Sequence, residues 1–184
     1  GSGIRILRQD LWEMIISFII SQQNNIKRIR HCIDLICQRY GEKKADDEGN
    51  VYYAFPTPKA LMDADLKELY ACNLGYRSRY VKETAAAVCM GDVSLDAIRG
   101  MAYREAVAEL SRLCGVGAKV ANCICLFALH HTDAFPVDTH INKVLKEQYP
   151  QGFPFERYAG YGGSLQQYIF YYDLMNGKKQ QGGR

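Results

Sequence analysis

The most informative stretch of the chain runs Leu113-Cys114-Gly115-Val116-Gly117-Ala118-Lys119-Val120-Ala121. Its two glycines separate an amphipathic helical pattern from the apolar helical pattern that follows. Glycine lets the backbone turn sharply and approach a phosphate closely, while the free N–H groups at the next helix start point at the anion. The spacing therefore predicts a tight hairpin between two helices. A simple glycine-rich turn without a ligand is also compatible with it.

Lys119 lies two residues after Gly117, in the first turn of the second predicted helix. The positive end of the helix dipole disfavours the protonated form of an amine there, and partial burial would act in the same direction. A neutral amine can attack carbon, as lysines that form Schiff bases do. The position thus indicates a candidate nucleophile, with a solvated surface lysine as the alternative.

Asp138 occurs within Phe135-Pro136-Val137-Asp138-Thr139-His140-Ile141, directly before another apolar helical pattern. An aspartate in this position is a typical N-cap. A capping carboxylate can also face the cleft that holds the hairpin lysine. There it would stabilise positive charge that develops on a sugar ring as its substituent leaves.

Apolar residues recur at spacings of three and four through most of the chain, which predicts an all-α fold. Thr57-Pro58 predicts an N-cap followed by the first residue of a helix. We find no period-two strand pattern and expect residues 41–53 to form an exposed loop with little regular structure. The polar residues 177–184 predict a flexible tail. The clearest helical patterns cover residues 11–18, 29–40, 79–88, 103–113 and 120–129.

Composition excludes several classes of protein. The 23 Lys and Arg residues nearly balance the 20 Asp and Glu residues, so the net charge of +3 favours no partner by itself. The apolar run 14–20 is too short to cross a bilayer and lacks the flanks of a signal peptide, so we expect an intracellular protein. The seven cysteines are scattered through helical patterns, which predicts reduced thiols. They form no compact ligand cluster, and we expect no metal or cofactor.

Together these motifs resemble the helix–hairpin–helix superfamily of DNA glycosylases, and within it the 8-oxoguanine DNA glycosylases. The resemblance spans nearly the whole chain. It implies two helical lobes that flank a DNA-binding cleft, a hairpin-containing lobe of residues 26–137 and a second lobe of residues 3–25 and 138–176. The resemblance rests on Gly3-Ile4-Arg5-Ile6-Leu7-Arg8-Gln9-Asp10, Ser17-Phe18-Ile19 through Asn24-Asn25-Ile26, Leu74-Gly75-Tyr76-Arg77-Ser78-Arg79-Tyr80, the hairpin block through Cys125, and Pro136-Val137-Asp138.

The chemistry that the resemblance implies is that of a bifunctional DNA glycosylase and abasic-site lyase. Lys119 would attack the sugar C1′, the oxidised base would leave, and β-elimination from the Schiff base would nick the strand, with Asp138 stabilising the charge. The target nucleotide must first be flipped out of the duplex. Cys123 and Phe170 would line the base pocket, and Gln166 would hydrogen-bond the Watson–Crick edge of the base.

The implied partner is duplex DNA that carries 8-oxoguanine or an abasic site, bound by a monomer. Residues matching the family's gap-filling and wedge positions are Gln23, Asn24 and Tyr76. Arg28 and Arg77 match positions that read the orphaned cytosine, and His140 matches one that contacts a phosphate. As alternatives, Asn24 and Asn25 could merely cap the helix that follows them. Tyr76 could belong to the core, and Arg28 and Arg77 could be solvated. The full set expected to contact DNA is Gln23, Asn24, Asn25, Arg28, Tyr76, Arg77, Gly115, Gly117, Val120 and His140.

The sequence departs from the family pattern in two places. Gln23 stands where eukaryotic members usually carry asparagine. Family enzymes also carry an N-terminal β-rich domain that recognises the N7 hydrogen of 8-oxoguanine, and we expect this chain to lack it. Two alternatives therefore remain: a truncated form with lyase activity only, and a non-catalytic helix–hairpin–helix module that binds DNA. A relative specific for oxidised pyrimidines is disfavoured, because no cysteine cluster follows Cys125.

Overall fold

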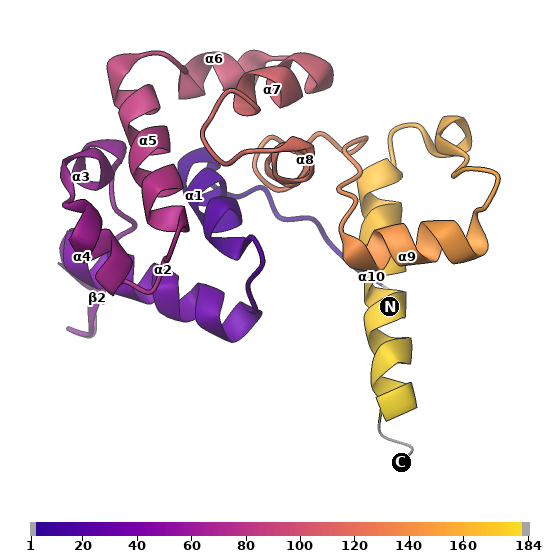
Figure 1. The fold of residues 1–184 in the computed structure, drawn as a ribbon, viewed down its shortest axis with the longest axis horizontal. Coiled ribbons are helices and arrows are strands. Elements are labelled where there is room, and N and C mark those ends of the chain that lie inside the picture. The colour runs from indigo at the N-terminus through magenta and orange to yellow at the C-terminus, as the bar shows by residue number, and fades with distance from the viewer. Residues whose placement is uncertain (1–2, 182–184) are drawn as a thin grey trace.

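The computed structural model describes residues 3–181, with side chains through residue 175, and this part is mostly helical, as predicted (Figure 1). None of its helices combines the length and the apolar character needed to cross a bilayer. The elements in chain order are α1 (Leu11–Ser21), α2 (Ile26–Tyr40), β1 (Lys43–Ala45), β2 (Val51–Tyr53), α3 (Pro58–Asp63), α4 (Leu66–Ala71), α5 (Arg77–Met90), α6 (Leu95–Gly100), α7 (Tyr103–Leu110), α8 (Ala118–Phe127), α9 (Thr139–Gln148), the 3-10 helix η1 (Phe155–Tyr158) and α10 (Gly162–Gln181).

Side-chain caps explain where many of these helices begin. Asp10 accepts a hydrogen bond from the Glu13 N–H at the start of α1, and Asn25 does the same for Arg28 in α2. Thr57 caps α3 ahead of Pro58, as the sequence predicts. Each cap satisfies an N–H group that has no partner within its own helix.

Helix α1 is the centre of the larger helical body. Its six buried residues cover two sides of the helix, so it packs against α2, α5 and α8 at once. So wide an apolar surface needs several partners, and all three of these helices lie within residues 26–137. The division into two lobes that the resemblance implies stays a prediction. The buried residues of α1 are Leu11, Trp12, Ile15, Ile16, Ile19 and Ile20.

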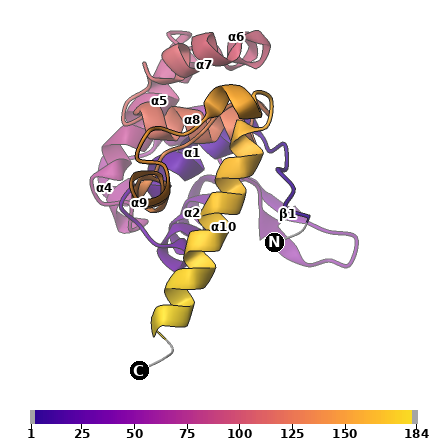
Figure 2. The same ribbon diagram turned by 90° about the vertical axis from the view of Figure 1, so that its right-hand side faces the viewer.

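Helices α9 and α10 pack on each other and stand to one side of α1–α8 (Figures 1 and 2). The connection from α8 to α9 is anchored at two points by the start of α10: Gly163 N–H donates to the Thr132 carbonyl at 2.7 Å, and the Gln166 side chain donates to the Pro136 carbonyl at 3.0 Å. The tail predicted for residues 177–184 overlaps the end of α10, which runs to Gln181, and its last three residues lie outside the described part.

Residues 43–53 form a short antiparallel hairpin where we expected an irregular loop. Lys43 pairs with Tyr53 and Ala45 with Val51. An Asp46 turn closes it, since that carboxylate accepts hydrogen bonds from the N–H groups of Glu48 and Asn50. Both strands are exposed on both faces, so the alternation of apolar and polar residues that predicts strands is absent.

Candidate active site

The hairpin between α7 and α8 has the geometry that its glycines predict. Gly115 has φ +78°, in the left-handed region, and lies against the Tyr80 ring of α5. Gly117 is the N-cap of α8 and offers no side-chain cap, so the first N–H groups of α8 are free for a ligand. Val120 is buried, which leaves its backbone N–H as the group available to a phosphate.

Two side chains from other elements hold the carbonyl groups of this hairpin. Thr84 of α5 donates to the Cys114 carbonyl at 3.2 Å, and Gln22, just after α1, donates to the Gly115 carbonyl at 2.9 Å. The hairpin is therefore fixed to the helical body from two sides.

Lys119 lies in the first turn of α8 and is exposed, so the partial burial that we expected is not found. Its Nζ atom lies 5.7 Å from the centroid of the Phe18 ring in α1. At this distance the ring face attracts a cation and gives the flexible side chain a preferred position. Among the side chains that the structure describes, no carboxylate forms an ion pair with this amine.

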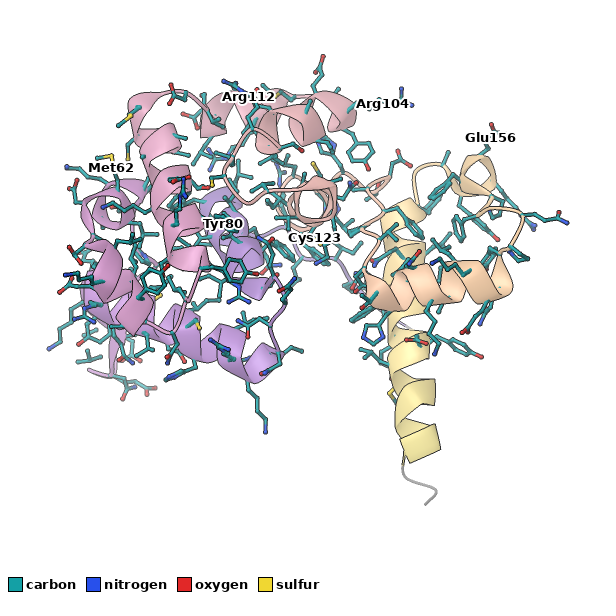
Figure 3. The ribbon with its side chains drawn as sticks, in the orientation of Figure 1. Met62, Tyr80, Arg104, Arg112, Cys123 and Glu156 are labelled. Carbon is teal, nitrogen blue, oxygen red and sulfur yellow. The ribbon has the colours of Figure 1, made fainter. Side chains whose placement is uncertain are left out.

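Cys123, which Figure 3 labels on α8, is buried and lies one helical turn after Lys119. Burial raises the pKa of its thiol above the ordinary value, and the charge of Lys119 together with a hydrogen bond from it acts in the opposite direction. The negative charge of Asp138 raises the pKa of the same thiol. Lys119 of α8 and Asp138 at the start of α9 are therefore both near enough to Cys123 for their charges to affect its thiol.

Asp138 is the N-cap of α9, as the sequence predicts. Its carboxylate accepts a hydrogen bond from the Ile141 N–H at 2.8 Å, and the residue is half-buried. The cap uses one carboxylate oxygen and fixes the direction of the side chain. Its charge therefore acts in the space next to Cys123 without neutralising Lys119 by direct contact.

Gln166 and Phe170 lie against the segment that carries Asp138. Gln166 is only 3% exposed, and its amide reaches the Pro136 carbonyl. Phe170, one turn later in α10, meets His140 edge to face with ring centroids 5.5 Å apart. Since Pro136 and His140 lie two residues before and after Asp138, the predicted pocket residues come together around the candidate acid.

His140 is exposed and pairs with Asp173 of α10, with Nδ1 and Oδ2 2.7 Å apart. The hydrogen bond from His140 is the main cause that lowers the pKa of the Asp173 carboxyl, and the charge of Lys143 adds to it. The phosphate contact predicted for His140 remains a prediction, and in this structure Asp173 orients the ring.

The residues predicted to fill the gap lie in the turn between α1 and α2. Gln23 is exposed at φ +46°, a left-handed conformation that costs a non-glycine residue free energy. Asn25 caps α2, which is the alternative role considered for it, whereas Asn24 donates to the Ile20 carbonyl at the end of α1 at 3.1 Å and does not cap α2. Their predicted contacts with DNA stay untested.

The pair Tyr76 and Arg77 begins α5 next to that turn. Tyr76 is 44% exposed, which excludes the core role and leaves its ring available as a wedge. Arg77, in contrast, is buried and donates to the Gln22 and Gln23 carbonyls, while its guanidinium lies 4.5 Å from the Tyr76 ring centroid. To read a base from here, Arg77 would have to exchange these acceptors. Arg28 is exposed and donates to the Asn73 carbonyl at 3.3 Å.

Sequence reasoning missed three residues that the structure brings to the site: Phe18 beneath Lys119, Gln22 on the hairpin carbonyl, and Asp173 on His140. In the sequence, Phe18 cannot be distinguished from the other apolar residues of its helix. Gln22 and Asp173 could not be predicted either, because their partners are distant in sequence. A spacing of seven from Gln166 does put Asp173 on the same side of α10, and this is the one signal that was available.

The comparisons with known proteins agree with this geometry. Residues 16–151 match the HhH-GPD superfamily of base excision DNA repair proteins. The N-glycosylase/DNA lyase of Saccharomyces cerevisiae is 38% identical over 80% of this chain and 42% of its own length. The N-glycosylase/DNA lyase of Arabidopsis thaliana is also 38% identical, over 76% of this chain and 39% of its own.

Among solved structures, the 8-oxoguanine glycosylase/lyase of Clostridium acetobutylicum in complex with double-stranded DNA superimposes with a TM-score of 0.88 and 38% identity. The match covers 96% of this chain and 64% of that one. The chain thus spans about two fifths of the length of the curated relatives it matches. The family match covers most of the chain and includes the hairpin, Lys119 and Asp138, so the chain belongs to the HhH-GPD superfamily of base excision DNA repair proteins.

Proposed function

We propose that this chain is the helical catalytic part of a DNA glycosylase and abasic-site lyase that excises 8-oxoguanine from duplex DNA. The observation that carries the proposal is that Lys119 begins the helix after the hairpin and Asp138 caps α9, and the charges of both act on the buried Cys123 thiol. A module that only binds DNA needs a hairpin but no amine opposed by a carboxylate. The relatives named N-glycosylase/DNA lyase and the 8-oxoguanine glycosylase/lyase structure with DNA support the same chemistry.

In the proposed reaction the Lys119 amine attacks C1′ of the flipped nucleotide. The bond from C1′ to the base breaks, and the base takes its electron pair and a proton. Loss of the remaining amine proton with opening of the sugar ring gives the Schiff base, and removal of a C2′ proton then expels the 3′ phosphate. Asp138 stabilises the positive charge on the sugar as the base departs.

Trapping with borohydride tests the role of the lysine. We expect the chain to form a covalent complex with abasic-site duplex DNA in the presence of borohydride, because reduction fixes the Schiff base. Lys119→Gln should abolish the complex. The matched control is Lys67→Gln, since Lys67 is also exposed and lies on α4. A complex that persists in Lys119→Gln, or none in the unmodified chain, would contradict the proposal.

The predicted role of Gln166 in the base pocket can be tested by comparing two DNA substrates. Gln166→Ala should lower excision of 8-oxoguanine much more than cleavage at a preformed abasic site, because only the first requires the base to be held. Gln38→Ala is the control, since Gln38 is exposed on α2, far in the sequence from the predicted pocket residues. Equal losses of activity on both substrates would mean that Gln166 has only a structural role, through its hydrogen bond to the Pro136 carbonyl. Cleavage of abasic DNA without any excision would favour the form with lyase activity only.

A further inference from the structure

The first turns of α2 carry exposed cations for which the structure records no carboxylate partner. Many exposed lysines and arginines are tied to a carboxylate, as in the pair Arg79 with Glu83 or Arg112 with Glu109. Lys27 and Arg30 form no ion pair with any side chain that the structure describes. The cations with recorded ion pairs are Arg39, Lys44, Lys59, Arg79, Arg99, Arg112 and Lys143.

Lys27 and Arg30 are exposed and three residues apart, so they lie on one side of the helix, away from the buried Cys32 and Ile36. We call these two residues the α2 basic face. No acidic residue occurs between Glu13 and Asp34, so nothing in this stretch of chain compensates their charge. Asp34 then lies one turn further along the same side and ends the basic face.

The position of the α2 basic face relative to the candidate site suggests what it binds. Helix α2 begins directly after the turn that carries Gln23 and Asn25, and the same turn is tied to α5 by Arg77 and to the hairpin by Gln22. Gln23 is predicted to occupy the gap that the flipped nucleotide leaves. Arg28, which the resemblance assigns to the cytosine opposite the lesion, lies between Lys27 and Arg30 in the first turns of α2. The two cations are therefore nearest to the strand that carries that cytosine.

We propose that Lys27 and Arg30 bind backbone phosphates of the DNA strand opposite the lesion. The inference rests on the proposed function, because it places the gap-filling turn at the lesion. Their side chains are long, they start about one helical turn apart, and neither forms an ion pair with a carboxylate that the structure describes. That arrangement suits two neighbouring phosphates of one strand, and it contributes affinity without reading the base sequence.

The experiment measures affinity against salt for Lys27→Gln/Arg30→Gln, with fluorescence anisotropy on a labelled duplex that contains a stable abasic analogue. Each lost phosphate contact should lower the slope of log affinity against log salt by about 0.9. For two contacts, the loss of affinity between 50 and 200 mM salt should be about 12-fold smaller in the double variant than in the unmodified chain. Arg39→Gln, on the same helix but paired with Glu68, is the matched control and should leave the slope unchanged.

The lesion strand alone is the second probe, since it lacks the opposite strand. We expect the double variant and the unmodified chain to have the same slope on it. An unchanged slope on the duplex would overturn the proposal, and an equal drop on both probes would overturn the assignment to the opposite strand. Borohydride trapping by the double variant at low salt keeps the two proposals apart, because it depends on Lys119 and not on the α2 basic face.

Discussion

Replacing Gly115 by alanine tests whether the hairpin requires glycine for two separate reasons. The residue has φ +78°, and a Cβ atom there would lie 2.4 Å from Cδ2 and 2.6 Å from Cγ of Tyr80. Both distances are far below van der Waals contact. The ring is half-buried on α5 and belongs to the larger helical body, so it cannot move without disturbing its neighbours.

The two costs can be estimated separately. A left-handed conformation costs an alanine about 1–2 kcal/mol. Forcing an additional methyl group into a packed contact costs about 1–3 kcal/mol more. We therefore expect Gly115→Ala to lower the free energy of unfolding by about 2–5 kcal/mol, which a domain of ordinary stability survives. Urea unfolding followed by far-UV circular dichroism measures this change.

Gly91 provides the control, because it has φ +81° but no atom near the place of a Cβ. Gly91→Ala should thus cost only the conformational term. In the double variant Tyr80→Ala/Gly115→Ala the ring is gone, so the contact term should disappear from the cost of the Gly115 substitution. Equal losses in Gly115→Ala and Gly91→Ala would refute the reasoning, and the hairpin would then need glycine for its backbone alone.

Two further predictions concern carboxylates of the site. Asp138→Ala removes the cap of α9 and should lower the free energy of unfolding by about 0.5–2 kcal/mol, and it should also abolish borohydride trapping. Asp138→Asn keeps a capping side chain, so it should keep the stability and still trap less DNA. Trapping at the original rate in the asparagine variant would exclude an electrostatic role for Asp138. The pKa of Asp173 is lowered by His140, so its stabilising effect is complete above about pH 3.9 and is lost as the pH falls through its lower folded pKa. The difference in unfolding free energy between the unmodified chain and Asp173→Asn should therefore shrink below that pH, and a constant difference would contradict this.

The helical fold could be predicted from the sequence because local signals agree with the packing. The apolar spacing of three and four in α1 and α8 describes faces that are buried in the structure, and the caps Thr57 and Asp138 begin helices as expected. The hairpin of residues 43–53 could not be predicted, because its strands bury nothing and their order comes from the turn at Asp46.

The parts of the site were predictable where one residue acts close to its own position in the chain. Lys119 and Cys123 share a side of α8 by helical spacing, and Asp138 follows from its capping position. The burial of Arg77 could not be predicted, since it depends on carbonyl groups more than fifty residues away. The placement of α1 could not be predicted either, because its sequence shows a wide apolar surface but not which helices cover it.

Lys119 and Asp138 belong to two different groups of packed helices. The distance between them therefore depends on the contacts that join these two groups. Lys119 is fixed by α8, which packs in the larger body, whereas Asp138 belongs to α9, which packs mainly on α10. The connection after α8 is held by backbone and side-chain hydrogen bonds from Gly163 and Gln166 at the start of α10. A ligand that shifts α10 should therefore also shift Asp138 relative to Lys119. Gln166 donates to the Pro136 carbonyl in the segment that carries Asp138. If Gln166 also holds the base, as proposed, filling the base pocket would couple to the alignment of Asp138 with Lys119.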